Sequence, residues 1–159
     1  MWHSYAITPI GPLLLVAEDE GLTRVSFARG GEPAEPPAGS LRDDGRLQPV
    51  AAQLREYFDG TRRAFDVALA PRGTAFQREV WNALLGIAYG DTRSYLDIAN
   101  RIGRPKAIRA VGAANGANPL PIIVPCHRVV GSNGSMTGFG GGIDVKRRLL
   151  DLERGGRLF

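Results

Sequence analysis

The residues best suited to covalent chemistry lie in one short run, Pro125-Cys126-His127-Arg128. Cys126 is the only cysteine among the 159 residues, and a thiolate is a strong nucleophile once a base or a positive charge favours its formation. His127 is adjacent and can serve as the base, while Arg128 adds positive charge. A lone cysteine is more often a small buried apolar residue, but this setting predicts a nucleophile.

A histidine that acts as a base is commonly oriented by a carboxylate, and Glu153 is the candidate. It falls at the end of a helix predicted over residues 144–153, where the helix dipole disfavours an acid, so we expect another group to hold it. The alternative interpretation is an ordinary surface glutamate. Before this helix, residues 138–142 form a glycine-rich loop whose backbone amides a planar ligand can approach.

Composition excludes several other kinds of chemistry. One cysteine and two histidines rule out a disulfide framework and a cysteine-rich zinc site, and no metal-ligand spacing is present, so we expect no metal. The first residues lack the basic and apolar regions of a signal peptide, and no apolar stretch approaches the roughly 20 residues that span a bilayer. We therefore expect a cytoplasmic protein with no membrane contact, and a monomer because no interface signature is apparent.

Charge is distributed unevenly along the chain. Residues 1–73 contain 8 Lys/Arg against 10 Asp/Glu, whereas residues 74–159 contain 12 against 6. A basic C-terminal half is typical of proteins with an anionic partner such as DNA phosphate, although a solvated basic surface would look the same.

The elements that must position Cys126 begin after the break at residues 71–73. Thr74 and Gln77 form a capping box at the start of a helix. That helix presents an apolar stripe predicted to face the core, made of Phe76, Val80, Trp81, Leu84 and Leu85. We interpret Trp81 as a core anchor rather than a platform for stacking a base.

Two short helices follow, with the proportions of a helix-turn-helix. Ser94 is the predicted N-cap of residues 95–102, and Gly103 ends that helix. Pro105 is placed at the first position of a second helix over about residues 106–115, with Ile108 and Val111 toward the core. The rest of the second helix is small or polar: Arg109, Ala110, Gly112, Ala113, Ala114, Asn115 and Gly116. Such a face suits close approach to another helix or to a DNA groove.

The N-terminal part has the pattern of a small sheet with one helix. We predict strands at residues 5–8, 13–17, 22–27 and 65–69, a turn at 9–12, a surface loop at 29–45, and a helix at 47–58 stopped by Gly60. This part carries no constellation of reactive residues. The sequence thus predicts an α+β protein with a structural α/β lobe at residues 1–73 and a mostly helical lobe at residues 74–159.

Taken together, these motifs resemble the O6-alkylguanine-DNA alkyltransferases. The similarity runs through Asn118-Pro119, residues 123–130, residues 137–142, and Lys146, Leu149, Leu150 and Glu153. Upstream it includes Phe76-Gln77, Val80-Trp81, Tyr89-Gly90, Ser94-Tyr95 and residues 109–112. It covers residues 74–153 closely and the N-terminal lobe loosely, where a ribonuclease H-like sheet is implied.

The resemblance assigns roles to individual residues. It implies that Cys126 accepts the alkyl group, that His127 deprotonates it through a water, and that Glu153 orients His127. It implies a helix-turn-helix in the minor groove of double-stranded DNA, with the target nucleotide flipped out. Arg109 then fills the vacated stack and Tyr95 assists rotation and hydrogen-bonds the base. The DNA-binding residues implied are Arg109, Ala110, Gly112, Ala113, Ala114 and Asn115, and those supporting the active site are Asn118, Val129, Phe139 and Gly140.

The implied reaction is a displacement at the alkyl carbon of O6-alkylguanine. Its thioether product has no hydrolysable bond and no cofactor to reset it, so each molecule would act once, in direct-reversal repair. The sequence leaves open the preferred alkyl group and whether O4-alkylthymine is accepted.

Two departures from the family pattern bear on these expectations. Many relatives carry Tyr before Ser or Ala in the glycine loop, whereas this chain has Phe139-Gly140. We interpret this as a looser pocket that leaves donation to the guanine oxygen to backbone amides. The chain also lacks the cysteines of a zinc-binding extension or of a phosphotriester-repair domain, so we expect the stand-alone, metal-free form.

Three alternatives fit less well. A non-catalytic alkyltransferase-like protein would have replaced Cys126. A helix-turn-helix transcription factor would carry long groove-reading side chains where this chain has Gly and Ala. A cysteine peptidase would need an oxyanion arrangement and usually has its histidine far from the cysteine in sequence.

Overall fold

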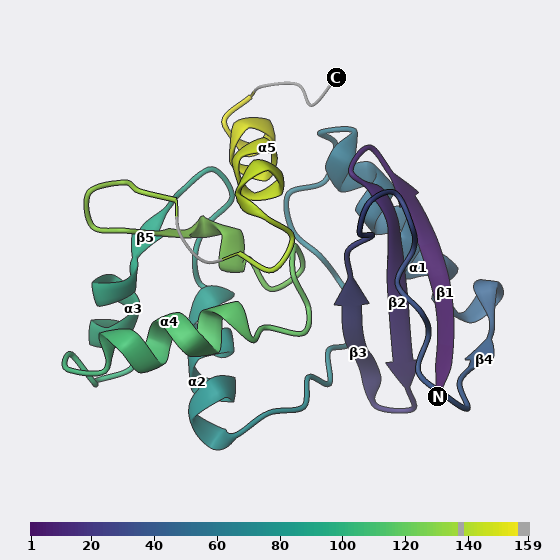
Figure 1. Cartoon of the computed structure of the whole chain (residues 1–159), viewed down its shortest axis with the longest axis horizontal. Helices are drawn as coiled ribbons and strands as arrows, with labels where there is room; N and C mark the ends of the chain where they lie inside the picture. Colours follow the sequence, from purple (N-terminus) through teal and green to yellow (C-terminus); the bar gives the residue numbers. More distant parts are fainter. Residues whose placement is uncertain (137–138, 156–159) are drawn as a thin grey trace. The chain divides into compact units, whose positions relative to one another are not determined.

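The computed structural model describes residues 1–136 and 139–155, so Thr137 and Gly138 of the family motif and positions 156–159 lie outside the described part. The described chain forms two compact units, one ending at Arg72 and the other beginning at Gly73. Figure 1 follows the chain through both. The expected α+β class is confirmed, with strands concentrated in the first unit and helices in the second.

The N-terminal unit is built on a four-stranded sheet in the order β3-β2-β1-β4. Its strands are β1 (Trp2–Thr8), β2 (Gly11–Glu18), β3 (Gly21–Ser26) and β4 (Leu41–Arg42). The β1–β2 and β2–β3 pairs are antiparallel, and β4 runs parallel to β1. The predicted hairpin and third strand are confirmed. Gly21 must be glycine here, because its φ is +147° and a Cβ would lie 2.5 Å from the carbonyl oxygen of Ala68.

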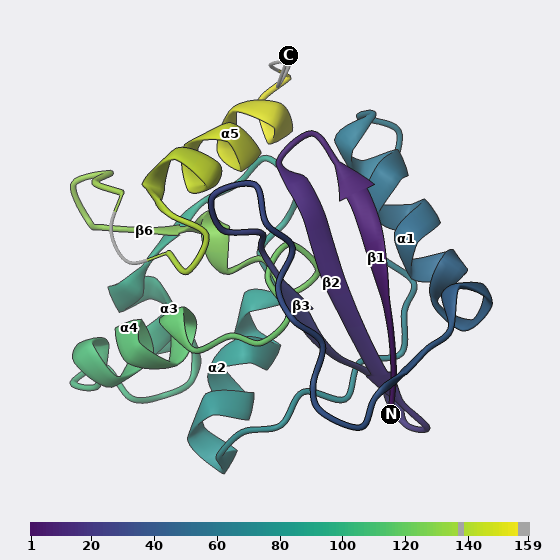
Figure 2. The ribbon, with the colours of Figure 1, turned by 45° about the vertical axis from the view of Figure 1, so that its right-hand side comes forward.

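One helix, α1 (Asp44–Phe58), packs beside β1 in this sheet, as Figures 1 and 2 both show. Asp43 caps it by accepting a hydrogen bond from the backbone N–H of Arg46. The helix buries one apolar face, made of Leu47, Val50, Ala51, Leu54, Tyr57 and Phe58. The central strand β2 is buried over five consecutive residues, 13–17. The core of this unit therefore lies between α1 and the middle of the sheet.

Two predictions for this unit are wrong. The expected loop at residues 29–45 contains β4 and the first two residues of α1. The expected strand at 65–69 is only a single parallel bridge between Leu22 and Leu69. Two backbone hydrogen bonds hold it, from Leu22 N to Ala68 O and from Ala70 N to Leu22 O. Pro71 follows at once and has no N–H with which to extend the ladder.

The second unit contains four α-helices among its described residues: α2 (Ala75–Leu84), α3 (Tyr95–Arg101), α4 (Ile108–Gly116) and α5 (Ile143–Glu153). A short parallel pair joins β5 (Arg93–Ser94) to β6 (Val129–Val130). The predicted capping box of Thr74 and Gln77 is present, and Ser94 caps α3 with Asp97 in the same way. Helix α4 packs against both α2 and α3 (Figures 1 and 2).

Three local predictions need correction here. Helix α4 begins at Ile108, because the preceding residues form a turn closed by a hydrogen bond from Ala107 N to Arg104 O. Leu85 and Ile108 are 50% and 42% exposed, so neither joins the core. Residues 121–124 form a turn, in which Ile122 has a φ of 74°. The core role of Trp81 is confirmed, since the side chain is 3% exposed.

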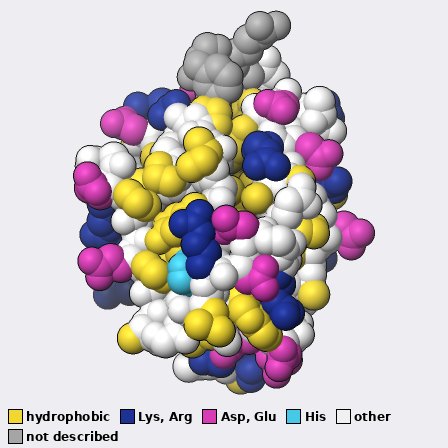
Figure 3. All heavy atoms as spheres, turned by 90° about the vertical axis from the view of Figure 1, so that its right-hand side faces the viewer, with side chains coloured by type: hydrophobic (Ala, Val, Ile, Leu, Met, Phe, Trp, Pro, Cys, Tyr) yellow, Lys and Arg dark blue, Asp and Glu magenta, His cyan; other side chains and the backbone are white. Residues whose placement is uncertain are grey.

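The surface of the N-terminal unit mixes both signs of charge. Figure 3 views the side on which α1, β1 and β4 lie, and acidic and basic side chains alternate there with apolar atoms. Several charges of this unit are paired, as in Arg42 with Asp44 and Arg72 with Glu18. Among the described residues, no helix is both long and apolar enough to cross a membrane.

Candidate active site

Cys126 opens a single turn of 3-10 helix, η1 (Cys126–Arg128), that follows the turn at residues 121–124. The side chain of Asn118 braces the approach, accepting from Leu120 N at 2.9 Å and donating from Nδ2 to Val124 O at 2.8 Å. The backbone N–H of Cys126 also donates to Val124 O, at 2.8 Å. These bonds fix the backbone before the nucleophile, and Cys126 itself is only 5% exposed.

The same approach segment contains an unusual backbone conformation. Ile122 is the one non-glycine residue with a positive φ in the described chain, and its side chain is 1% exposed. A β-branched residue disfavours the left-handed region by about 1–2 kcal/mol. Surrounding contacts must therefore impose this conformation, which reverses the chain just before Cys126.

His127 and Glu153 form a fully buried pair. Nε2 of His127 lies 2.6 Å from Oε2 of Glu153, with the side chains 0% and 1% exposed. A carboxylate can only accept, so Nε2 carries the hydrogen and Nδ1 of neutral His127 is left as the acceptor. No described residue hydrogen-bonds Nδ1. The alternative that Glu153 is a surface glutamate is therefore wrong, and His127 presents a basic nitrogen inside the protein.

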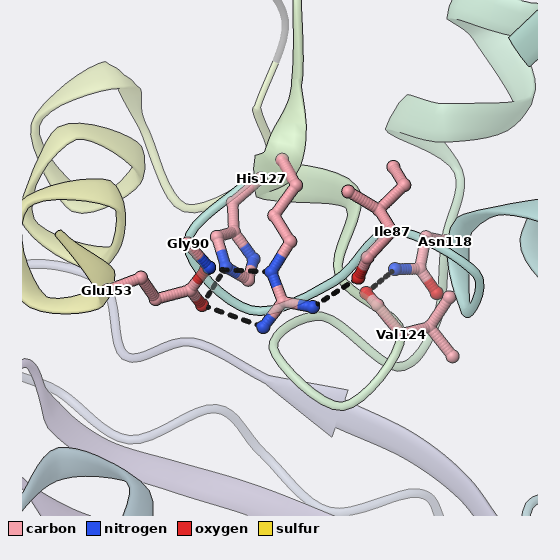
Figure 4. A network of polar contacts seen from close by, with 7 residues as sticks. Ile87, Gly90, Asn118, Val124, His127 and Glu153 are labelled. Carbon is pink, nitrogen blue, oxygen red and sulfur yellow. Dashed lines mark hydrogen bonds and ion pairs between the residues drawn. The ribbon is translucent and has the colours of Figure 1, made fainter. Parts of the chain in front are cut away.

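Arg128 also binds the carboxylate of Glu153, which Figure 4 shows beside His127 in a network of polar contacts. Its Nε donates to Oε1 of Glu153 at 2.7 Å and its Nη2 to Oε2 at 3.0 Å. A third bond runs from Nη1 to the carbonyl oxygen of Ile87, at 2.8 Å. Arg128 was expected to favour the thiolate by its charge; instead its guanidinium is used to neutralise Glu153. This arrangement also explains how an acid is tolerated at the C-terminal end of α5.

The electrostatics of the site keep its reactive pair uncharged at rest. Burial raises the pKa of the Cys126 thiol from 9.0 to about 11, against the opposing effects of a hydrogen bond with Asn118 and the charge of Lys146. Burial also lowers the pKa of His127, although Glu153 opposes the shift. A thiol and a neutral imidazole are thus the stable forms near neutral pH. A thiolate at this position would need a base to take up its proton, and neutral His127 offers Nδ1 as an acceptor.

Lys146 is a site residue that we did not predict. It lies on α5 with its side chain fully buried, and Nζ donates to the carbonyl oxygen of Val129 at 2.6 Å. Burial lowers its pKa, while the interaction with Cys126 raises it. The signal was available, because Lys146 stands three, four and seven residues before Leu149, Leu150 and Glu153, on the buried face of the helix.

Helices α3 and α4 carry the predicted DNA-binding residues. Arg109, Ala110 and Ala113 are exposed, and Tyr95 is partly buried. Gly112 lies against Tyr95, since a Cβ there would stand 3.9 Å from two ring carbons. The structure therefore presents Arg109 and the two alanines to solvent, with Gly112 beside the tyrosine ring.

Two residues of that set face inward. Ala114 is 3% exposed and its carbonyl oxygen accepts from Nε1 of Trp81 at 2.8 Å. Asn115 is 2% exposed and donates from Nδ2 to the carbonyl oxygen of Cys126 at 3.3 Å. The prediction that Ala114 and Asn115 face a DNA groove is wrong, because the helical period turns these positions toward α2 and the Cys126 turn.

The glycine-rich segment is described from Phe139 onward. Phe139 is partly buried, and its carbonyl oxygen accepts from Gly142 N at 3.0 Å, just before α5. Gly140 is exposed, and a Cβ added to it would meet nothing within 4 Å among the described atoms. An alanine at position 140 can therefore be accommodated without a clash.

Comparison with known proteins agrees with this geometry. Two family models together match almost the whole chain. The 6-O-methylguanine DNA methyltransferase ribonuclease-like domain matches residues 1–71, and the DNA-binding domain of the same family matches residues 75–155. The methylated-DNA–protein-cysteine methyltransferase of Methanosarcina acetivorans is 50% identical over 153 residues, covering 96% of this chain and 98% of its own.

Two further relatives come from Mycobacterium tuberculosis and Bacillus subtilis. The M. tuberculosis protein OGT, crystallised in complex with DNA, superposes with a TM-score of 0.91 at 46% identity, covering 99% of this chain and 96% of that one. The inducible methylated-DNA–protein-cysteine methyltransferase of B. subtilis is 56% identical over 118 residues, which are 73% of this chain and 66% of that protein. From the family models and these relatives, this chain belongs to the 6-O-methylguanine DNA methyltransferase family.

Proposed function

We propose that this chain repairs DNA by direct reversal, transferring the alkyl group of O6-alkylguanine irreversibly to Sγ of Cys126. One observation carries the proposal. His127, which is buried and lies 2.6 Å from the carboxylate of Glu153, directly follows Cys126, the only cysteine of a chain that belongs to this family. The curated relatives named above are methylated-DNA–protein-cysteine methyltransferases. Their activity fits the chemistry that this site offers.

The residues act in a defined order. Nδ1 of His127 accepts the thiol proton through a water while Glu153 stabilises the imidazolium that forms. Sγ then attacks the alkyl carbon; the S–C bond forms as the C–O6 bond breaks, and its electron pair leaves with guanine. Proton donation from the phenol of Tyr95 neutralises the departing base, and the proton taken from Cys126 restores the phenol through solvent. The net change moves one proton from the thiol to guanine.

The product explains why this reaction would occur once per molecule. A thioether carries no hydrolysable bond, so neither water nor a general base can release the alkyl group. No cofactor is required for any step. Each molecule is therefore consumed stoichiometrically by the lesion that it repairs.

DNA recognition would use the exposed part of α3 and α4 in the minor groove of double-stranded DNA. Ala110, Gly112 and Ala113 leave room for close approach of the backbone, and Arg109 would occupy the stack vacated by the flipped nucleotide. The excess of basic residues in this half of the chain supports binding to phosphate. We propose that the protein acts as a monomer in the cytoplasm, with the N-terminal unit in a structural role.

The intact mass of the protein tests this function. After incubation with DNA that contains O6-methylguanine, the native chain should gain one methylene unit on the peptide that contains Cys126, saturating at one per molecule. Cys126→Ser is the matched control and should gain nothing. Absence of transfer, or continued turnover beyond one alkyl group per molecule, refutes the proposal.

The Phe139-Gly140 sequence leads to a proposal about alkyl size. Without a hydroxyl or methyl at position 140, the pocket should accept groups larger than methyl more readily. Gly140→Ala can be made without a clash among the described atoms. Because the added methyl would narrow the pocket, this variant should lower the rate with O6-benzylguanine relative to O6-methylguanine in DNA. An unchanged ratio of the two rates would contradict this idea.

A further inference from the structure

The side chain of Asn115 is buried beside the nucleophile, with a hydrogen-bond partner for Nδ2 but none among the described residues for Oδ1. Nδ2 donates to the carbonyl oxygen of Cys126 at 3.3 Å, and the residue is 2% exposed. That carbonyl can only accept, so the amide cannot be rotated by half a turn without placing oxygen against oxygen. Oδ1 must therefore point away from the carbonyl, and no described residue hydrogen-bonds it.

The side chain of His127, the residue that follows Cys126, presents a second buried acceptor. Because Nε2–H donates to Glu153, Nδ1 is an acceptor, and it too is unpartnered among the described residues. These two atoms are the whole set of buried side-chain polar atoms without partners in the described chain. One belongs to the residue bonded to the Cys126 carbonyl and the other to the residue that follows Cys126.

Two acceptors cannot satisfy each other, so the shortage at this site is of donors. Leaving a buried acceptor unsatisfied costs about 1–3 kcal/mol. The thiol of Cys126 has a single weak S–H donor. A water molecule has two donor hydrogens and can still accept from the thiol, so it matches the two acceptors and the one donor together.

We propose that Asn115 is a positioning residue for alkyl transfer, whose Oδ1 and His127 Nδ1 together bind the water that carries the thiol proton. Its Nδ2 meanwhile holds the Cys126 peptide in place. This inference rests on the proposed function for its role, whereas the two unpartnered acceptors from which the water site is inferred are features of the structure itself. It assigns Asn115 to the proton path instead of the DNA surface where the sequence had placed it.

The position of Asn115 on α4 also links this helix to the peptide of the nucleophile. The preceding carbonyl, that of Ala114, is held by Trp81 Nε1 at 2.8 Å. Two successive residues of α4 are thus tied, one to α2 and the other to the peptide of the nucleophile. Misplacement of a reacting group by about 1 Å can lower a rate by 10²-fold, so loss of the Asn115 amide should slow the reaction without changing residues that meet DNA.

Two variants and one control separate this role from general packing. Asn115→Leu keeps the branched shape of the side chain and removes both the carbonyl oxygen and the NH2 of the amide. Asn115→Asp keeps an acceptor oxygen and can replace the Nδ2 donor only while its carboxyl is protonated. Val111→Ala alters a fully buried apolar residue of the same helix that forms no part of the site, so it reports the effect of destabilisation alone.

The first measurement is the single-turnover rate of methyl transfer as a function of pH, with DNA affinity measured in parallel. Asn115→Leu should lower the rate by about 10- to 100-fold near neutral pH, with unchanged affinity, and shift the profile to higher pH. Asn115→Asp should lose activity as pH rises and its carboxyl ionises. Val111→Ala should keep the native profile. The proposal is overturned if Asn115→Leu matches Val111→Ala; should Asn115→Leu fail to fold, the profile of Asn115→Asp decides in the same way.

The second measurement needs no DNA and therefore stands apart from the proposed function. Alkylation of Cys126 by iodoacetamide is followed by mass across the same pH range. Asn115→Leu should reach the alkylation rate of the native protein only at a higher pH, because the proton path from Cys126 to His127 is interrupted. A profile identical to the native one overturns the inference about Asn115, whereas a shifted profile without transfer from DNA overturns the proposed function alone.

Discussion

Replacement of Arg128 by methionine should destabilise the protein and move the pH dependence of alkyl transfer upward. Arg128 neutralises Glu153 through hydrogen bonds of 2.7 and 3.0 Å, and the Glu153 side chain is 1% exposed. Methionine keeps much of the apolar stem and removes the charge. The carboxylate would then lose its cationic partner while keeping its hydrogen bonds with His127 and with the backbone N–H of Gly90, so that its charge would be left uncompensated in the interior.

The size of the effect follows from that burial. Breaking a buried ion pair from one side costs about 3–5 kcal/mol, which for a chain of this length lowers Tm by on the order of 10 °C. His127 can relieve part of the cost by taking up a proton. Burial is the main cause that lowers its pKa and the charge of Arg128 contributes in the same direction, so removing that charge raises the pKa. An imidazolium that persists toward neutral pH cannot accept the thiol proton.

The assay is the single-turnover rate of methyl transfer from DNA across about pH 6 to 9, with urea unfolding of the same samples. Arg154→Met is the matched control, because it removes the same charge from an exposed position one residue after Glu153. Arg128→Met should regain rate as pH rises, while the control keeps the native profile and stability. If Arg128→Met shows the native pH profile, the argument that Arg128 sets the protonation of His127 is refuted.

Three further predictions concern stability and rate. The lowered pKa of His127 contributes stability that is present above pH 6.5, its ordinary pKa, and is lost as the pH falls below that value. The raised pKa of Cys126 contributes stability that is lost as the pH rises from 9.0 toward about 11. In a plot of the urea midpoint against pH, Cys126→Ser should therefore flatten only the alkaline side. Ile122→Gly should be at least as stable as Ile122→Ala in urea, because glycine accepts a φ of 74°; a glycine variant less stable by about 1 kcal/mol, as in ordinary helix or strand backbone, would argue against strain. Lys146→Met should slow methyl transfer by removing the bond to Val129 and the charge near Cys126, yet unfold at the same or a higher urea concentration, since burial of the ammonium lowers its pKa; an unaltered rate would exclude this role.

Local signals in the sequence were sufficient for much of the fold. The capping box of Thr74 and Gln77 and the N-cap at Ser94 depend on neighbouring residues, and both helices begin where these signals predict. The hairpin at the start of the chain follows from two β-prone runs around a short turn. Local signals failed where a long-range partner decided the outcome, as at residues 65–69, which meet the sheet through Leu22 alone.

The chemistry of the site was divided in the same way. The sequence by itself was sufficient to predict the nucleophile, the adjacent base and the candidate acid, because Cys126 and His127 are contiguous and Glu153 belongs to the same family motif. Only the tertiary structure decided what each one touches. It placed Arg128 on Glu153 instead of beside the thiol, and it turned Asn115 from the expected DNA face to the Cys126 peptide. Such outcomes depend on which side of a helix is buried and on how buried charges are compensated, and both are properties of the packed chain.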